Sequence, residues 1–182
     1  MTRLFLIRHG KAKADWGSAL DPGLDKVGLE QARKTALVLA PKGPLDIISS
    51  PLARAMETAA PLAEIWGVTP RPEERVGEIA SPVKNLSERG QWLEKIMADK
   101  WCNLDHTLQT WRGKVIDTLL AINNDTAVFT HFIAINAAVG ATTRDDRVVN
   151  FLPDNGSITI LGADRRGLTL IEHGVEAYTQ VH

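Results

Sequence analysis

Residues 3–10 read Arg3-Leu4-Phe5-Leu6-Ile7-Arg8-His9-Gly10, and this stretch decides the fold. Its four consecutive apolar residues predict a short strand that is buried on both faces, as in a parallel sheet. Such a strand delivers the residues after it to the carboxyl edge of the sheet, where open α/β folds bind ligands. Gly10 permits a sharp turn or a close approach of a ligand to the backbone there. An arginine and a histidine therefore stand together where a site is expected.

Strand and helix signals alternate along most of the chain. Further buried strands are predicted over 45–50 and 126–130, and a C-terminal hairpin over 157–161 and 168–173. Apolar spacing predicts helices over 29–39, from Pro51 to Trp66, over 87–97 and over 108–122, with a short one that Gly140 ends. Alternation of this kind is typical of an α/β sandwich. We expect a mostly parallel central sheet with an antiparallel portion near the C-terminus.

Size and composition narrow the class of protein. The 182 residues suit a single domain over 1–182, and 44% apolar with 24% charged residues is ordinary for a globular protein. A net charge of -1 gives no general electrostatic case for nucleic acid or an anionic membrane as partner. Cys102 is the only cysteine, so an internal disulfide and a cysteine metal cluster are excluded. With no membrane-length apolar run and no secretory signal, we expect a cytoplasmic location.

Cationic residues occupy three predicted junctions between a strand and a helix. Arg8 and His9 follow the first strand, Arg54 lies in the opening turn of the second helix, and His131 follows the strand over 126–130. In a parallel sheet these junctions share one edge, where helix N-termini also present free N–H groups. The combination predicts a site for phosphate. Taken singly, Arg54 could be a surface partner of Glu57, and His131 could be satisfied by a backbone carbonyl.

Four motifs, taken in order, resemble the histidine phosphatase superfamily with its phosphoglycerate mutase-like fold. They are residues 6–10 (Leu-Ile-Arg-His-Gly), residues 49–59 (Ser-Ser-Pro-Leu-Ala-Arg-Ala-Met-Glu-Thr-Ala), residues 77–79 (Gly-Glu-Ile) and residues 130–131 (Thr-His). Their order and separations fit the family from residue 4 to about residue 140. The resemblance implies a three-layer α/β/α sandwich around the mostly parallel sheet.

The resemblance also implies a role for each motif residue. His9 would attack phosphorus and carry a phosphohistidine intermediate. Arg8 and Arg54 would hold the non-bridging oxygens, and His131 would add a donor as an imidazolium. Glu78 would protonate the leaving oxygen and then activate water. Since phosphoryl transfer depends on positioning and charge stabilisation, fixed cations would suffice without a cofactor or metal.

Some positions depart from the family pattern or leave alternatives open. Phe132 stands where many members have glycine, so its backbone N–H could still bind phosphate while its ring reshapes the pocket wall. Lys11-Ala12 and Trp16-Gly17 replace an acidic residue or glutamine followed by threonine, and a Trp-Asn pair. Glu73 and Glu74 could serve as the acid in place of Glu78. These departures bear on the substrate more than on the chemistry.

The resulting hypothesis is a metal-independent phosphatase that hydrolyses phosphomonoesters, either small phosphorylated molecules or a phosphoprotein. A phosphoglycerate mutase-type transfer is the nearest rival, because a phosphohistidine can return its phosphoryl group to a rearranged product. The short chain has no long insertion to close over the site and exclude water, which favours hydrolysis. A non-catalytic module that binds phosphorylated ligands is the alternative from another class, and it would not need the nucleophile. The oligomeric state is open, with a homodimer among the options.

Overall fold

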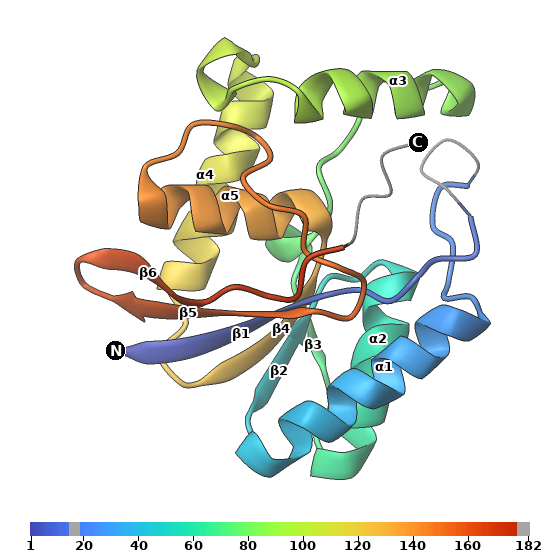
Figure 1. Ribbon diagram of the computed structural model, residues 1–182, viewed down its shortest axis with the longest axis vertical. Helices are drawn as coiled ribbons and strands as arrows, with labels where there is room; N and C mark the ends of the chain where they lie inside the picture. Colours follow the sequence, from blue (N-terminus) through green and yellow to red (C-terminus); the bar gives the residue numbers. More distant parts are fainter. Residues whose placement is uncertain (15–18, 178–182) are drawn as a thin grey trace.

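The computed structural model describes residues 1–14 and 19–177, and a six-stranded sheet lies at its centre (Figure 1). The strand order is β3-β2-β4-β1-β5-β6. The strands are β1 (Thr2–Arg8), β2 (Asp46–Ser49), β3 (Arg71–Pro72), β4 (Thr126–Thr130), β5 (Ile158–Asp164) and β6 (Gly167–Glu172). Neighbours from β3 to β1 pair in parallel, whereas β5 pairs with both β1 and β6 antiparallel. This confirms the expected mostly parallel sheet with an antiparallel C-terminal portion.

Helices cover both faces of the sheet, which confirms the three-layer sandwich (Figure 1). They are α1 (Lys26–Leu39), α2 (Ala53–Trp66), α3 (Leu86–Met97), α4 (His106–Leu120) and α5 (Phe132–Thr143). Short 3₁₀ turns span Ala40–Lys42, Glu74–Val76 and Trp101–Asn103. Helices α1 and α2 lie on one face, and α4 and α5 lie on the other, with α3 farther out on that second side. In the described part of the chain, no helix is long and apolar enough to cross a bilayer.

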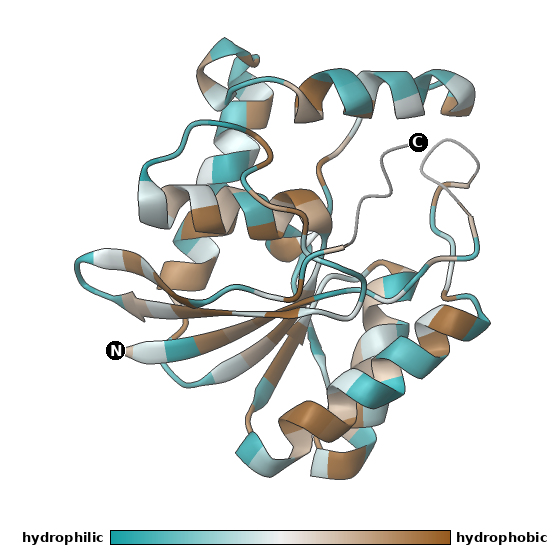
Figure 2. Ribbon diagram, viewed as in Figure 1, coloured by the Kyte–Doolittle hydropathy of each residue, from teal (hydrophilic) through white to brown (hydrophobic). Residues whose placement is uncertain are grey.

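The strand β1 is buried on both faces, as its sequence predicts. Phe5 and Ile7 pack in one cluster with residues of α1 and α2, while Leu4 and Leu6 pack in another with residues of α4 and α5. All four side chains are at most 3% exposed. The strands accordingly form the hydrophobic centre of the molecule, and the polar residues lie outward on the helices (Figure 2).

Of the helix boundaries that differ from the sequence-based expectation, two have a clear structural cause. Pro51 lies before α2, because the chain turns at Ser50, whose Oγ accepts from the N–H of Leu52 (3.3 Å), and the helix begins only at Ala53. Gly140 does not end α5, which continues to Thr143. A Cβ at Gly140 would lie 2.8 Å from the carbonyl oxygen of Asp145, so this glycine admits the returning chain.

The C-terminal hairpin is tighter than predicted. Strands β5 and β6 are joined by Arg165 and Arg166 alone, and Gly167 takes the positive φ of 127° that the turn requires. Arg71 and Pro72 form β3, a two-residue strand at the edge of the sheet beside β2. A short edge strand of this kind offers little unpaired backbone to other chains.

The loop after β1 packs directly on the start of α1. A Cβ at Gly10 would lie 2.5 Å from the carbonyl oxygen of Gly28, and a Cβ at Gly28 would collide with the carbonyl oxygen of Lys11. Asp25 caps the helix by accepting from the N–H of Gly28 (2.7 Å). This contact fixes the backbone of the Arg8-His9-Gly10 turn against α1.

We expect Gly28→Ala to destabilise the protein and Gly113→Ala to leave it unchanged or more stable. A methyl group at Gly28 has no room, so overpacking should lower the free energy of unfolding by about 1–3 kcal/mol. Gly113 lies in α4, and a Cβ placed there would have no atom within 4 Å, so alanine should add up to about 1 kcal/mol. Urea unfolding of both variants measures the difference; equal stabilities would contradict the close contact.

Candidate active site

His9 is held by two contacts that define its protonation state. Its Nδ1 lies 2.7 Å from the carbonyl oxygen of Gly10, and its Nε2 lies 3.3 Å from Nε of Arg54. A carbonyl only accepts hydrogen bonds, so Nδ1 carries the proton and Nε2 presents a lone pair. Burial lowers the pKa of His9 to about 3, and the neighbouring cations Arg54 and Arg8 contribute to that fall. The ring is therefore a neutral imidazole whose Nε2 lone pair accepts a hydrogen bond from Nε of Arg54, and the neutral form is the one that a nucleophile requires.

Arg54 lies in the first turn of α2, as predicted, and is only 5% exposed. The carboxylate of Asp21 stands 3.7 Å from its Nη1 and also accepts from the N–H of Ala53 (2.9 Å). Thr58 links the same helix to the loop after β1: it donates to the carbonyl of Arg54 (2.6 Å) and accepts from the N–H of Gly10 (3.0 Å). Arg54 is thus a surrounded, oriented cation rather than a surface arginine.

Arg8 is oriented by the segment that precedes β5. Its Nη1 donates to the carbonyl of Pro153 (2.8 Å), and its guanidinium lies 5.1 Å from the ring centroid of Phe132. The neighbouring Asn155 donates to the carbonyl of His9 (2.9 Å). Phe132 is the first residue of α5, and its ring lines the cavity, as expected for the pocket wall. Its N–H has no acceptor within the helix.

His131 is fully buried at the N-cap of α5, with its ring centroid 5.1 Å from that of His9. Its Nε2 lies 2.8 Å from Oγ of Ser50. Burial lowers the pKa of His131 well below its ordinary value, and His9, Arg54 and Arg8 lower it further. Burial therefore favours a neutral ring over the expected imidazolium in the free protein, because a third positive charge is unfavourable in this desolvated cluster.

Glu78 is the one of the three acids considered that faces the cavity. Its Oε1 accepts from the N–H of Ile79 (2.9 Å), and its Oε2 lies 4.0 Å from Nδ1 of His131. Burial raises the pKa of Glu78 to about 6, although Arg54 and Arg8 oppose that rise. The carboxyl group can therefore hold or release a proton near neutral pH.

The other two acids lie elsewhere. Glu73 forms ion pairs with Arg75 (2.8 Å) and Arg71 (3.6 Å), beside a separate hollow at the β2–β3 side of the sheet. Glu74 is exposed in the 3₁₀ turn of residues 74–76. Neither side chain lines the cavity that holds His9.

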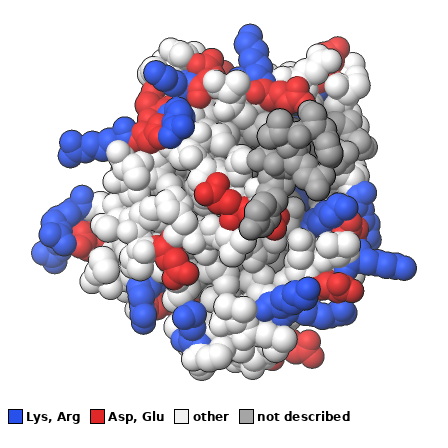
Figure 3. Space-filling view, viewed as in Figure 1, with Lys and Arg blue, Asp and Glu red and all other residues white. Residues whose placement is uncertain are grey.

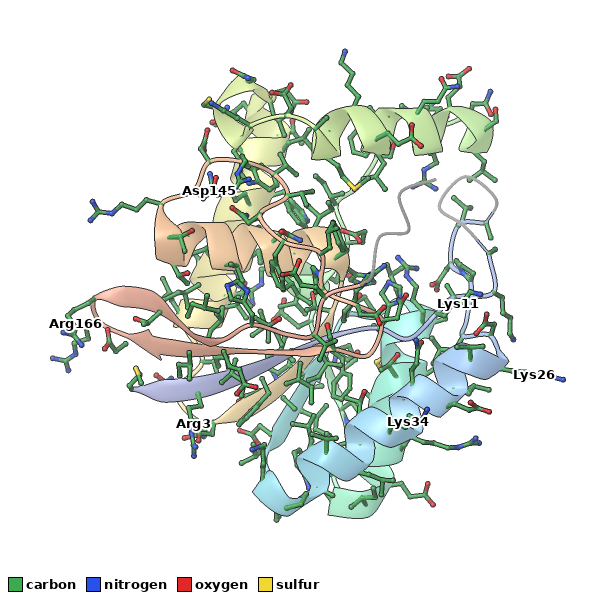
Figure 4. All side chains as sticks on the ribbon, viewed as in Figure 1. Arg3, Lys11, Lys26, Lys34, Asp145 and Arg166 are labelled. Carbon is green, nitrogen blue, oxygen red and sulfur yellow. The ribbon has the colours of Figure 1, made fainter. Side chains whose placement is uncertain are left out.

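One cavity of about 710 Å³ brings the predicted site residues together. Arg8, His9, Arg54, Glu78 and Phe132 all line it, and His131 lies directly behind His9 and Glu78. Lys11 and Ala12 contribute to its rim, and Figure 4 shows Lys11 on the loop after β1. Trp16 and Gly17, the other departure from the family pattern, lie outside the described residues. Within residues 1–14 and 19–177, no three His, Cys, Asp or Glu side chains gather as metal ligands would.

Several residues that orient the site do not emerge from the sequence patterns. Ser50 and Thr58 belong to the second motif, which by itself assigns them no role, yet Ser50 contacts His131 and Thr58 holds Gly10. The sequence around Asp21 indicates only a turn, and nothing in it predicts the contact of this carboxylate with Arg54. Asn155 carries no local signal, because it reaches His9 only through the antiparallel pairing of β5 with β1.

We expect Glu78→Gln to stabilise the protein at pH 8 but not at pH 4. The pKa of Glu78 is about 6 in the folded chain, against an ordinary value of 4.5. Below pH 4.5 the carboxyl group is protonated in both the folded and the unfolded chain, so the folded state carries no penalty. As the pH rises through 6 the buried group becomes ionised, and the cost of burying its charge lowers the free energy of unfolding. The gain at pH 8 should be about 2 kcal/mol. Urea unfolding at both pH values measures this gain in the free energy of unfolding, with Glu94→Gln at an exposed position as control. A gain that does not depend on pH would contradict the raised pKa of Glu78.

Comparisons with known proteins agree with this geometry. The profile of the histidine phosphatase superfamily (branch 1) matches residues 4–176. A glucosyl-3-phosphoglycerate phosphatase of Mycolicibacterium vanbaalenii is 44% identical over 69 residues, covering 36% of this chain and 31% of the relative. The glucosyl-3-phosphoglycerate phosphatase of Mycobacterium tuberculosis is 40% identical over 80 residues, covering 42% of this chain and 36% of the relative. The match thus spans about a third of the length of these curated relatives.

Solved structures share the whole fold. A phosphoserine phosphatase of Entamoeba histolytica in complex with 3-phosphoglyceric acid has a TM-score of 0.75 at 25% identity, covering 98% of both chains. A mycobacterial glucosyl-3-phosphoglycerate phosphatase has a TM-score of 0.73 at 21% identity, covering 97% of this chain and 100% of that one. The profile match, which extends over nearly the whole described chain, establishes the family. The chain belongs to branch 1 of the histidine phosphatase superfamily.

Proposed function

We propose that this protein hydrolyses phosphomonoesters through a phosphohistidine formed on His9, with Glu78 as the proton donor. The observation that carries the proposal is the fixed tautomer of His9. Its Nδ1–H is committed to the carbonyl of Gly10, so only Nε2 can act as the nucleophile, and it faces Arg54 across 3.3 Å. A binding module would need the cations but not this orientation of the ring.

In the first step, Nε2 of His9 attacks phosphorus while the bond from phosphorus to the leaving oxygen breaks. Glu78 gives its proton to that oxygen, so the product leaves as a neutral alcohol and Glu78 becomes a carboxylate. The phosphorylated ring retains the proton on Nδ1 and therefore carries positive charge. The carbonyl of Gly10, 2.7 Å away, stabilises that charge.

In the second step, water takes the place of the leaving alcohol. The Glu78 carboxylate accepts a proton from water as its oxygen attacks phosphorus, and the bond between phosphorus and Nε2 breaks. Inorganic phosphate departs, and both His9 and the protonated Glu78 are restored. The two steps together consume one water and one ester, and yield one alcohol and one phosphate.

Cations and backbone dipoles around His9 would stabilise the transferred group. Arg8 and Arg54 supply two fixed positive charges with planar donor sets that suit phosphoryl oxygens. The N-terminus of α5 adds the free N–H of Phe132 and a positive dipole end. His131, whose Nε2 lies 2.8 Å from Oγ of Ser50, would support His9 and Glu78 from behind as a neutral ring. These groups supply charge stabilisation without a metal or cofactor.

Hydrolysis of small phosphorylated molecules is the form of the reaction that the relatives support. The two curated relatives and the two solved structures compared above are all named phosphatases, and none is named a mutase. Their names specify phosphoserine and glucosyl-3-phosphoglycerate, which are small phosphomonoesters. We therefore place this chain among phosphatases of small molecules, ahead of mutases and phosphoprotein phosphatases.

The proposal predicts that His9→Ala abolishes hydrolysis of p-nitrophenyl phosphate in the presence of EDTA, with a loss of at least about 10³-fold in kcat. Arg54→Ala should lose on the order of 10²-fold, as expected for one transition-state donor. His106→Ala, at an exposed histidine of α4, is the matched control. Equal activity of the wild type and His9→Ala would rule out the proposed mechanism. Loss in EDTA with recovery on adding a divalent cation would overturn its metal independence.

A further inference from the structure

Most polar residues of the active-site cavity gather around His9, while Lys11 and Arg89 lie among the apolar lining residues. The polar side chains at its floor come from the strand ends and the start of α2, and they include Arg8, His9 and Arg54. Most of the other lining residues are apolar: Leu20, Pro22, Ile79, Leu93, Met97 and Phe132 form the larger part of the walls. A bound ester would place its phosphate on the floor and the rest of the molecule against these walls.

One wall is a face of α3. Leu93 and Met97 are four residues apart, so they lie on the same side of the helix, and both line the cavity. Ile96 is 7% exposed and holds this helix in a hydrophobic cluster with Ile79 and Ile133. The wall is therefore anchored to the core, and Leu93 and Met97 remain only partly covered.

Ala19, Leu20 and Pro22, which precede α1, form another part of the cavity wall. Leu20 is 75% exposed although it lines the cavity, and Pro22 lies beside it. Asp21, between them, caps the start of α2, and Glu57 accepts from the N–H of Leu24 (2.6 Å). These two hydrogen bonds hold residues 21–24 against α2, so Leu20 lies at the cavity next to an anchored segment.

We propose that the preferred substrates are phosphomonoesters whose leaving group is apolar, such as an alkyl chain or an aromatic ring. This inference rests on the proposed phosphatase activity and specifies the substrate class for the same site. Contact of an apolar group with Leu20, Leu93 and Met97 removes apolar surface of both partners from water. A carboxylate in the same place would lose hydration without compensation from those walls.

Two cationic residues that line the cavity, Lys11 and Arg89, reduce the preference for an apolar leaving group without abolishing it. Nζ of Lys11 is 3.6 Å from the carboxylate of Asp25, and the side chain is 59% exposed, so its charge is shared and hydrated. Arg89 lies one turn before Leu93 on α3 and also lines the cavity. Arg89 is the residue that would favour a second anionic group, and it provides the competing outcome of the test.

Three alkyl phosphates with leaving groups of similar basicity test the inference: ethyl phosphate, n-hexyl phosphate and the phosphate monoester of 6-hydroxyhexanoate. Each methylene fully removed from water is worth about fourfold. Partial burial of four additional methylenes should raise kcat/KM for the hexyl ester at least about tenfold above the ethyl ester. The carboxylate-tipped ester should fall below the hexyl ester.

Variants assign the preference to the walls. Leu93→Ser and Leu20→Ser should each lower the hexyl-to-ethyl ratio severalfold; Leu20 is so exposed that its replacement leaves folding intact. Leu37→Ser removes a leucine that is 68% exposed on α1, outside the cavity, and should leave the ratio unchanged. The hexyl-to-ethyl ratio of kcat/KM is the readout, because a variant that merely lowers the amount of folded protein or the activity of the phosphate-binding residues lowers both values equally.

Two outcomes would overturn the inference while the proposed function stands. The first is His9-dependent hydrolysis with a hexyl-to-ethyl ratio near one. The second is a preference for the carboxylate-tipped ester that is lost in the Arg89→Gln variant. Absence of His9-dependent hydrolysis for all three esters, and for p-nitrophenyl phosphate, would instead overturn the proposed function itself. A ratio above ten that both wall variants lower supports the inference.

Discussion

The parallel pairing of β4 with β1 and β2 is the constraint on which the site depends. Arg8 is opposite Thr130 in the β1–β4 register, and Ser49 is opposite Phe129 in the β2–β4 register. The next residues along each strand, His9, His131 and Ser50, therefore emerge side by side at one edge. The N–H of His9 donates to the carbonyl of Thr130 (3.0 Å), so the hydrogen-bond ladder extends to the proposed nucleophile.

Desolvation at this edge sets the chemistry that the groups can perform. A buried and a half-buried arginine stand beside two buried histidines, and the histidines respond by remaining neutral. The same burial keeps Glu78 protonated to higher pH than an ordinary carboxyl group. Burial thus both keeps His9 a neutral imidazole and keeps a proton available on Glu78. These buried groups reduce stability in the free protein, which is typical of sites organised for a ligand.

The charged surface away from the cavity adds little to this account. Acidic and basic side chains are interspersed on the face shown in Figure 3, as the net charge of -1 leads one to expect. In the proposed reaction, the charged groups around His9 suit any phosphate, and the apolar lining residues of the cavity are the part that would distinguish one ester from another.

The layers, the sheet and the convergence of the cations follow from sequence patterns. Buried strands and periodic helices predicted the sandwich, and strand-to-helix junctions predicted that Arg8, His9, Arg54 and His131 meet. Features fixed by tertiary contacts did not follow. Gly140 resembles a helix stop, yet it lies inside α5 because another segment packs on it. The charge of His131 could not be inferred either, since it depends on burial and on neighbours distant in sequence.

In the proposed mechanism, Nε2 of His9 carries the phosphoryl group between the two steps. Rapid quenching in alkali during turnover of ³²P-labelled phenyl phosphate, followed by peptide mapping, would detect this intermediate. We expect an acid-labile, alkali-stable label on the peptide that contains His9, transferred to water at the rate of turnover and absent from His9→Ala. Label on another residue, or full turnover by the wild type without any labelled protein, would rule out a phosphohistidine at His9.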